Sequence, residues 1–155
     1  TYSPVSDLNM QLGYTFQKSR YKEPETWSEN PNIEPQTRMF RTPDHYGFMT
    51  IDYTMFEALN IALSGTYTGC MLVQHFAGYI AEDVEMTTPN FFDMGIKIAY
   101  DYKLSNNNVI QFNGGVKNIF NSYQDDFDQG ADRDAGYIYG PALPRTFFLG
   151  LKLGI

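Results

Sequence analysis

The chain has 155 residues, of which 43% are hydrophobic and 16% aromatic, and its formal net charge is −7. This length predicts one domain, and a negative charge without a basic stripe disfavours a nucleic-acid partner. A mean hydropathy of −0.38 and the lack of any apolar run of about 18 residues exclude a transmembrane helix, while the single cysteine, Cys70, permits no internal disulfide.

Alternating side chains predict six β-strands along the chain. They span residues 7–17, 48–53, 59–68, 92–104, 110–117 and 147–155. From Phe92 to Leu104 every even position is apolar, and every odd position is polar or small. Because successive side chains of a strand point to opposite faces, each strand has one apolar and one mostly polar face.

The length of these runs favours lipid as the environment of the apolar faces. At a tilt of roughly 45°, about ten residues cross the apolar band of an outer membrane, whereas globular strands average about 5 to 6 residues. Tyrosines on the apolar faces suit the membrane interface; they are Tyr14, Tyr53, Tyr67, Tyr100 and Tyr102. A soluble sheet in which these tyrosines pack across strands is the alternative. We predict an all-β, antiparallel transmembrane β-barrel.

The connections between the predicted strands alternate between short and long. Residues 55–58 and 105–108 are tight turns, whereas 21–44, 70–89 and 121–144 are long. Outer-membrane barrels have short turns at one rim and long extracellular loops at the other. Loops of this length are uncommon in compact soluble domains and often carry binding sites.

Six strands are fewer than the roughly eight of the smallest outer-membrane barrels. The chain begins almost directly on a strand at Asp7 and lacks a charged segment followed by an apolar one at its start. We therefore expect residues 1–155 to be the C-terminal part of a larger barrel or one piece of a split barrel.

Three segments resemble the last strands of TonB-dependent outer-membrane receptors: RTPDHYGFMTIDY at 41–53, GVKNIFNSY at 115–123 and GPALPRTFFLGLKLGI at 140–155. The family phrase V-x-N-h-F-[DN]-x-x-Y is matched with one residue fewer before its tyrosine; the matching residues are Val116, Asn118, Ile119, Phe120, Asn121 and Tyr123. Pro144 and Arg145 match the Pro-Arg pair that precedes the final strand of the family.

The resemblance implies a barrel of about twenty-two strands, filled by an N-terminal plug that this chain lacks. It implies import of a scarce, large ligand, a siderophore, haem, corrinoid or glycan, across the outer membrane of a Gram-negative bacterium. The implied partners are membrane lipid, the rest of the barrel with its plug, the TonB complex acting through the plug, and a surface lipoprotein. Because the plug is missing, this chain alone should not transport.

The last predicted strand also resembles the C-terminal assembly signal of the family. Its apolar row consists of Phe147, Leu149, Leu151, Leu153 and Ile155. The resembled family commonly ends in phenylalanine, so Ile155 is a departure. An assembly machine could receive this row edge to edge through free backbone groups, and a plain lipid-facing strand would have the same pattern.

Candidate chemistry is sparse. The acidic run 125–134 could bind calcium, but its spacing does not match the D-x-[DN]-x-[DN]-G loop, and a solvated acidic loop is favoured. No catalytic partner can be assigned to His45 or His75, which are interpreted as polar residues of loops or strand ends, so we expect no enzyme and no cofactor.

Three aromatic residues of the long loops are candidate contacts for a ligand or a partner protein. Trp27 lies in a loop rich in proline and glutamate, and Tyr137 and Tyr139 lie in AGYIYGP. Exposed aromatic side chains of this kind often anchor interfaces. Packing within the loops explains all three equally well.

The leading function is a TonB-coupled importer. The alternatives are a passive porin or adhesin barrel and a soluble β-domain that binds through its loops. A requirement for detergent would separate the soluble domain from the other two, and a plug encoded upstream would separate the importer from the porin.

Overall fold

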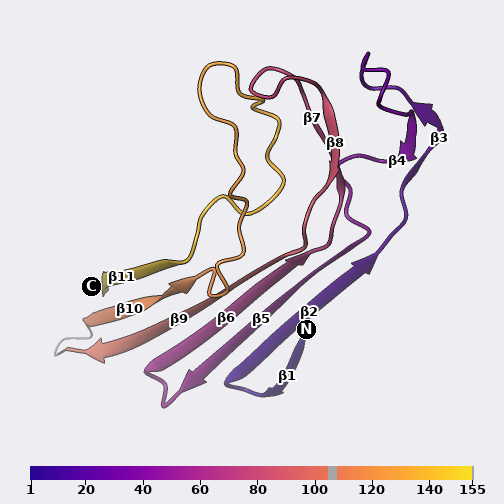
Figure 1. Cartoon of the computed structure of the whole chain (residues 1–155). Helices are drawn as coiled ribbons and strands as arrows, with labels where there is room; N and C mark the ends of the chain where they lie inside the picture. Colours follow the sequence, from indigo (N-terminus) through magenta and orange to yellow (C-terminus); the bar gives the residue numbers. More distant parts are fainter. Residues whose placement is uncertain (105–107, 155) are drawn as a thin grey trace.

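The computed structural model describes residues 1–104 and 108–154 and consists of strands and connecting segments. Seven strands form one antiparallel sheet in the order β1-β2-β5-β6-β9-β10-β11 (Figure 1). They span Tyr2–Val5 (β1), Leu8–Phe16 (β2), His45–Met55 (β5), Leu59–Thr68 (β6), Phe91–Lys103 (β9), Val109–Lys117 (β10) and Thr146–Gly154 (β11). None of the described residues belongs to a helix long and apolar enough to cross a membrane.

The register of the sheet joins the alternating patterns of its strands into two continuous faces. Leu12 lies opposite Met49, Met49 opposite Gly65, and Gly65 opposite Met94. At the other side of the sheet, Phe112 lies opposite both Tyr100 and Leu151. Directly opposed residues point to the same face of a sheet, so the apolar rows of β2, β5, β6, β9, β10 and β11 form one face.

This apolar face is exposed. Leu12 is 81% exposed and Leu149 94%, although burial of such side chains is the usual rule in water. The opposite face is largely polar; for example, Gln111 donates a hydrogen bond to the Asp101 carboxylate at 2.7 Å. The sheet therefore has no apolar core on either side within the described residues.

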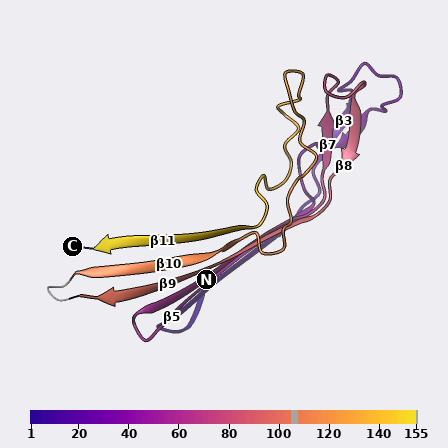
Figure 2. The same cartoon turned by 60° about the vertical axis from the view of Figure 1, so that its left-hand side comes forward.

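The three long connections leave the sheet at the same end (Figures 1 and 2). They follow β2, β6 and β10, whereas the short turn at 55–58 lies at the other end. The first two contain two-stranded sheets, one of β3 (Arg20–Glu25) with β4 (Gln36–Arg38) and one of β7 (Leu72–His75) with β8 (Val84–Thr87). We name these connections L1 (17–44), L2 (69–90) and L3 (118–145).

The six predicted strands are confirmed in position, and so is the division into short and long connections. The sequence missed β1, so the expectation that the first strand starts at Asp7 was wrong. It also missed the strands inside L1 and L2, which are only three to six residues long and too short to show a period. Most of the predicted turn 105–108 and Ile155 lie outside the described residues.

Candidate functional site

The buried core of the described residues lies among the long connections and not on the sheet. Met71 and Val73 of L2 pack with Tyr137 of L3, and Met86 and Tyr139 lie against them. Val73 has no exposed surface and Tyr137 is 3% exposed. We call the packed assembly of L1, L2 and L3 the loop cluster.

An ion-pair geometry joins L2 to L3. His75 Nε2 lies 2.9 Å from both carboxylate oxygens of Asp128, and the side chain of Asp128 is 2% exposed. The His75 ring stacks on the Tyr137 ring with 3.6 Å between the centroids. The Asp128 carboxylate also accepts a hydrogen bond from the Asp134 backbone N–H at 2.9 Å. Burial raises the pKa of Asp128, but the hydrogen bonds from Asp134 and His75 outweigh it and lower the pKa overall.

A second carboxylate of L3, Asp126, accepts hydrogen bonds from two tyrosine hydroxyls. Tyr137 and Tyr139 each donate to it at 2.8 Å. Burial opposes ionisation of Asp126, yet these bonds and one from Gln124 lower its pKa. Burial and the neighbouring carboxylate raise the pKa of Tyr139 to about 12 and also raise that of Tyr137. The site favours an ionised Asp126 beside two neutral tyrosines.

Gln124 holds the two ends of L3 together. Its side chain is 1% exposed; Nε2 donates to the Tyr137 carbonyl at 3.1 Å, and Oε1 accepts from the Tyr139 N–H at 2.9 Å. Its own N–H donates to the Pro141 carbonyl at 2.9 Å. A buried amide with these partners fixes the path of L3.

Most of the acidic run 125–134 is exposed, as expected of a solvated loop, but three of its carboxylates also take part in hydrogen bonds of the loop cluster. Asp126 and Asp128 accept hydrogen bonds from side chains of the loop cluster, and Asp134 accepts one from the Phe76 N–H at 3.1 Å. The sequence could not reveal the bonds from His75 to Asp128 and from Phe76 to Asp134, because these two donors come from L2. Across residues 1–104 and 108–154, no group of three or more potential metal ligands lies together.

L1 packs against L2 through an aromatic cluster and polar contacts. The Trp27 ring meets Phe40 and Phe76 edge-on, at centroid distances of 5.8 and 5.4 Å. The Ser28 hydroxyl donates to Asp83 at 2.6 Å, and this bond, with one from the Ala77 N–H, lowers the pKa of Asp83. Trp27 Nε1 is buried without a hydrogen-bond partner.

Trp27, Tyr137 and Tyr139 thus lie inside contacts between the long connections. Their positions agree with packing within the loops, which is one of the two interpretations that the sequence left open. Contact of these residues with a ligand or a partner stays a prediction.

The two histidines lie at strand ends. His45 begins β5, where its Nδ1 lies 2.7 Å from the Tyr14 hydroxyl. His75 is the last residue of β7 and is buried.

Two of the three segments that carry the family resemblance, 115–123 and 140–155, meet in the structure. Asn118 directly follows β10, has a φ of 50° and is 3% exposed. Its Nδ2 donates to the Ser122 and Leu143 carbonyls at 3.2 and 2.9 Å, while its Oδ1 accepts from the Ser122 N–H. Asn121 Oδ1 accepts from the Arg145 N–H at 2.9 Å. These two asparagines join the start of L3 to its end, just before β11.

The predicted assembly row lies on β11. Phe147 is 73% exposed, Leu151 62% and Leu153 65%. Among the described residues β11 pairs with β10 only, so its second edge has free backbone groups. A role for this strand in assembly stays a prediction.

Comparison with known proteins gives a likeness in fold. No protein-family model matches the sequence, and no curated protein matches it. A solved structure with the same fold is that of the ferric-catecholate import receptor Fiu from Escherichia coli K12 in a closed form, with a TM-score of 0.63. The likeness is one of fold alone.

The alignment covers 94% of this chain at 22% sequence identity, so the likeness extends over nearly all of the described sheet and loop cluster. This chain covers 18% of the length of the receptor. The all-β, antiparallel architecture of this chain is consistent with a barrel fragment.

Proposed function

We propose that the chain is the C-terminal part of the β-barrel of a TonB-dependent outer-membrane receptor, which imports a scarce, large ligand. The observation that carries the proposal is the continuous apolar face of six strands. Leu149 is 94% exposed and Leu12 81% at its two sides. An apolar face of this extent marks a surface that contacts a membrane or another protein, and under this proposal it contacts the hydrocarbon of the membrane.

The arrangement of the connections supports the same proposal. The long connections leave one end of the sheet, as the extracellular loops of outer-membrane barrels do. The polar face, which carries Lys97, Asp101 and Gln111, would line a wet lumen. The remaining strands, the plug and the TonB complex would belong to the rest of the protein, and the loop cluster would lie at the outer mouth of the lumen.

The ligand class is a siderophore, haem, corrinoid or glycan, and the likeness to a ferric-catecholate import receptor makes ferric chelates the first ligands to test. Uptake of ferric catecholates, haem, cobalamin and oligosaccharides should be compared in cells with and without the full-length gene. Uptake of one of these should require both the receptor and an intact TonB complex. Uptake that persists without TonB would support a passive porin and overturn the importer.

Membrane location needs a separate test. The full-length protein should fractionate with the outer membrane and should change its electrophoretic mobility on heating, as closed barrels do. A well-folded protein recovered from the aqueous fraction would support the soluble loop-binding domain and would overturn both barrel functions.

A further inference from the structure

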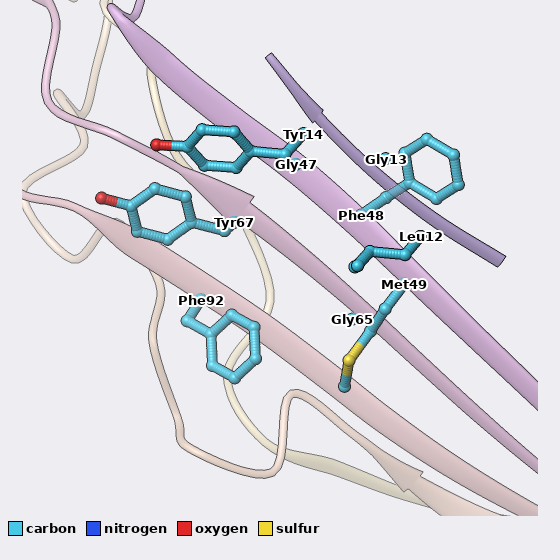
Figure 3. A pocket seen from close by; sticks show the side chains of 9 residues that line it. All are labelled: Leu12, Gly13, Tyr14, Gly47, Phe48, Met49, Gly65, Tyr67 and Phe92. Carbon is cyan, nitrogen blue, oxygen red and sulfur yellow. The ribbon is translucent and has the colours of Figure 1, made fainter. Parts of the chain in front are cut away.

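The apolar face contains a groove between β2, β5, β6 and β9 (Figure 3). Its volume is about 210 Å³. The side chains around it are Leu12, Tyr14, Met49, Tyr67 and Phe92, and the lining is almost wholly apolar. Phe48 lies beside it on the other face of the sheet, over Gly13.

Two glycines make this groove. Gly47 lies opposite Tyr14 and Tyr67, and Gly65 lies opposite Met49. A Cβ on Gly65 would come within 3.2 Å of the Met49 side chain and 3.6 Å of the Phe92 ring. The neighbouring positions of the same face carry large side chains, so the missing side chains at Gly47 and Gly65 leave a depression in an otherwise filled surface.

The groove has a polar end. The Tyr14 hydroxyl lies 2.7 Å from His45 Nδ1, at the start of β5 where L1 enters the sheet. Tyr67 stands next to the last residue of β6, and its hydroxyl points in the same direction as that of Tyr14 (Figure 3). The polar atoms therefore gather at the end of the groove nearest the long connections, and the rest of its length is apolar.

We propose that this groove binds one acyl chain of a membrane lipid in the outer leaflet. The inference rests on the proposed function, under which the face around the groove is immersed in lipid and the long connections are extracellular. The groove is continuous with that face and has the same chemistry. Tyrosine hydroxyls suit the level of lipid head groups, where one end of the ring is apolar and the other is wet. The apolar part holds the chain below them.

The test uses the full-length receptor in nanodiscs of phosphatidylethanolamine that carries a photoreactive diazirine on one acyl chain. After irradiation, mass spectrometry gives the cross-linking yield at two sets of residues on the apolar face. The groove set is Met49, Tyr67 and Phe92. The reference set is Phe112 and Leu151, which are 52% and 62% exposed outside the groove.

Random contact with lipid would favour the reference set, because Met49, Tyr67 and Phe92 are only partly exposed. A held acyl chain should instead give a yield several-fold higher in the groove. Gly65→Val fills the floor and should remove this excess. Gly114→Val adds the same side chain to the same face outside the groove, beside the exposed and movable Leu149, and should keep the excess.

The outcomes separate the groove from the proposed function. If the cross-linking yield of the groove set in the unaltered receptor is equal to or lower than that of the reference set, the lipid site is overturned but the proposed barrel is not. The same conclusion holds if a second copy of the chain covers the groove. Absence of cross-links from both sets would overturn the membrane location itself. If Gly65→Val fails to assemble, Gly65→Ala takes its place. The comparison of the groove set with the reference set in the unaltered receptor still tests the proposed lipid site.

Discussion

The His75 ring lies flat against the Tyr137 ring, with 9° between their planes, while its Nε2 approaches both oxygens of Asp128. One side chain of L2 thus contacts two side chains of L3 at once. A stacked, buried pair that is also hydrogen bonded has few alternative arrangements. L2 and L3 should therefore open together and not one at a time.

His75→Ala should speed backbone hydrogen exchange in both residues 72–87 and residues 124–139 of the full-length protein. The substitution removes the stack and leaves the buried Asp128 carboxylate without its partner in L2. Hydrogen exchange with mass spectrometry measures the effect, and the turn at 55–58, at the other end of the sheet, should not change. Faster exchange confined to 72–87 would contradict the coupling.

The phenol of Tyr139 should titrate at a pH near 12 and at a lower pH in Asp126→Asn. The substitution removes a charge that opposes phenolate formation, while burial still holds the pKa above 10. Asp125→Asn is the control, because Asp125 contributes least to the raised pKa of Tyr139. Phenolate absorbance, compared between these variants and the unaltered protein, measures the shift; equal shifts in the two variants would contradict the assignment.

These pKa directions also set a pH window for the loop cluster. A raised tyrosine pKa adds stability that is present below pH 10 and is lost as the pH rises through about 12. A lowered Asp126 pKa adds stability that is present above 3.8 and is lost as the pH falls below it. Protection of the loop cluster from protease should decline at both limits, and Asp126→Asn should weaken the acidic decline.

Ile98→Arg should destabilise the folded receptor by about 2 to 4 kcal/mol, because the charge would lie in lipid near the middle of β9. Ser64→Arg, on the polar face of β6, should have a much smaller effect. Ser64 is a better control than Ala99, which is 5% exposed and has no room for a large side chain. Urea titration of the receptor in lipid vesicles measures both, and equal costs would refute the assignment of the faces.

Asn118→Ala should cost about 2 to 4 kcal/mol, because it removes the three side-chain hydrogen bonds of Asn118 and puts alanine at a positive φ. Asn118→Asp should not be milder, because its carboxylate replaces the donor to the Ser122 and Leu143 carbonyls with a second acceptor, although it still accepts from the Ser122 N–H. The exposed Asn9→Ala on β2 is the control. Urea titration with protease sensitivity of L3 measures the result; a neutral Asn118→Ala would show that the turn does not hold L3.

The sheet was predictable because its information is local. Alternation with period two marks β2, β5, β6, β9, β10 and β11 along the chain, and the register in which they pair must keep their apolar rows on the same face of the sheet. β1 contains Pro4 and spans only four residues, so it has no readable period. The same limit hid β3, β4, β7 and β8.

The loop cluster was not predictable in the same way because its contacts are distant in sequence. His75 and Asp128 are 53 positions apart, and Arg41 Nη1 donates to the Ile138 carbonyl across 97 positions. The acidic run gave no sign that Asp126 would accept from two tyrosines. The asparagine motif was visible, but its physical role, joining the two ends of L3, required the structure.

The turn at 55–58 differs from the three long connections in its independence. Phe56 and Glu57 adopt positive φ values, and Phe56 is 87% exposed, without contacts to L1, L2 or L3. A peptide epitope inserted there would leave the far end of the sheet undisturbed and, if the proposed topology holds, would be hidden from antibodies on intact cells. The same epitope inserted in L2 would disturb its neighbours on both sides, so only the short turn suits a neutral reporter of orientation.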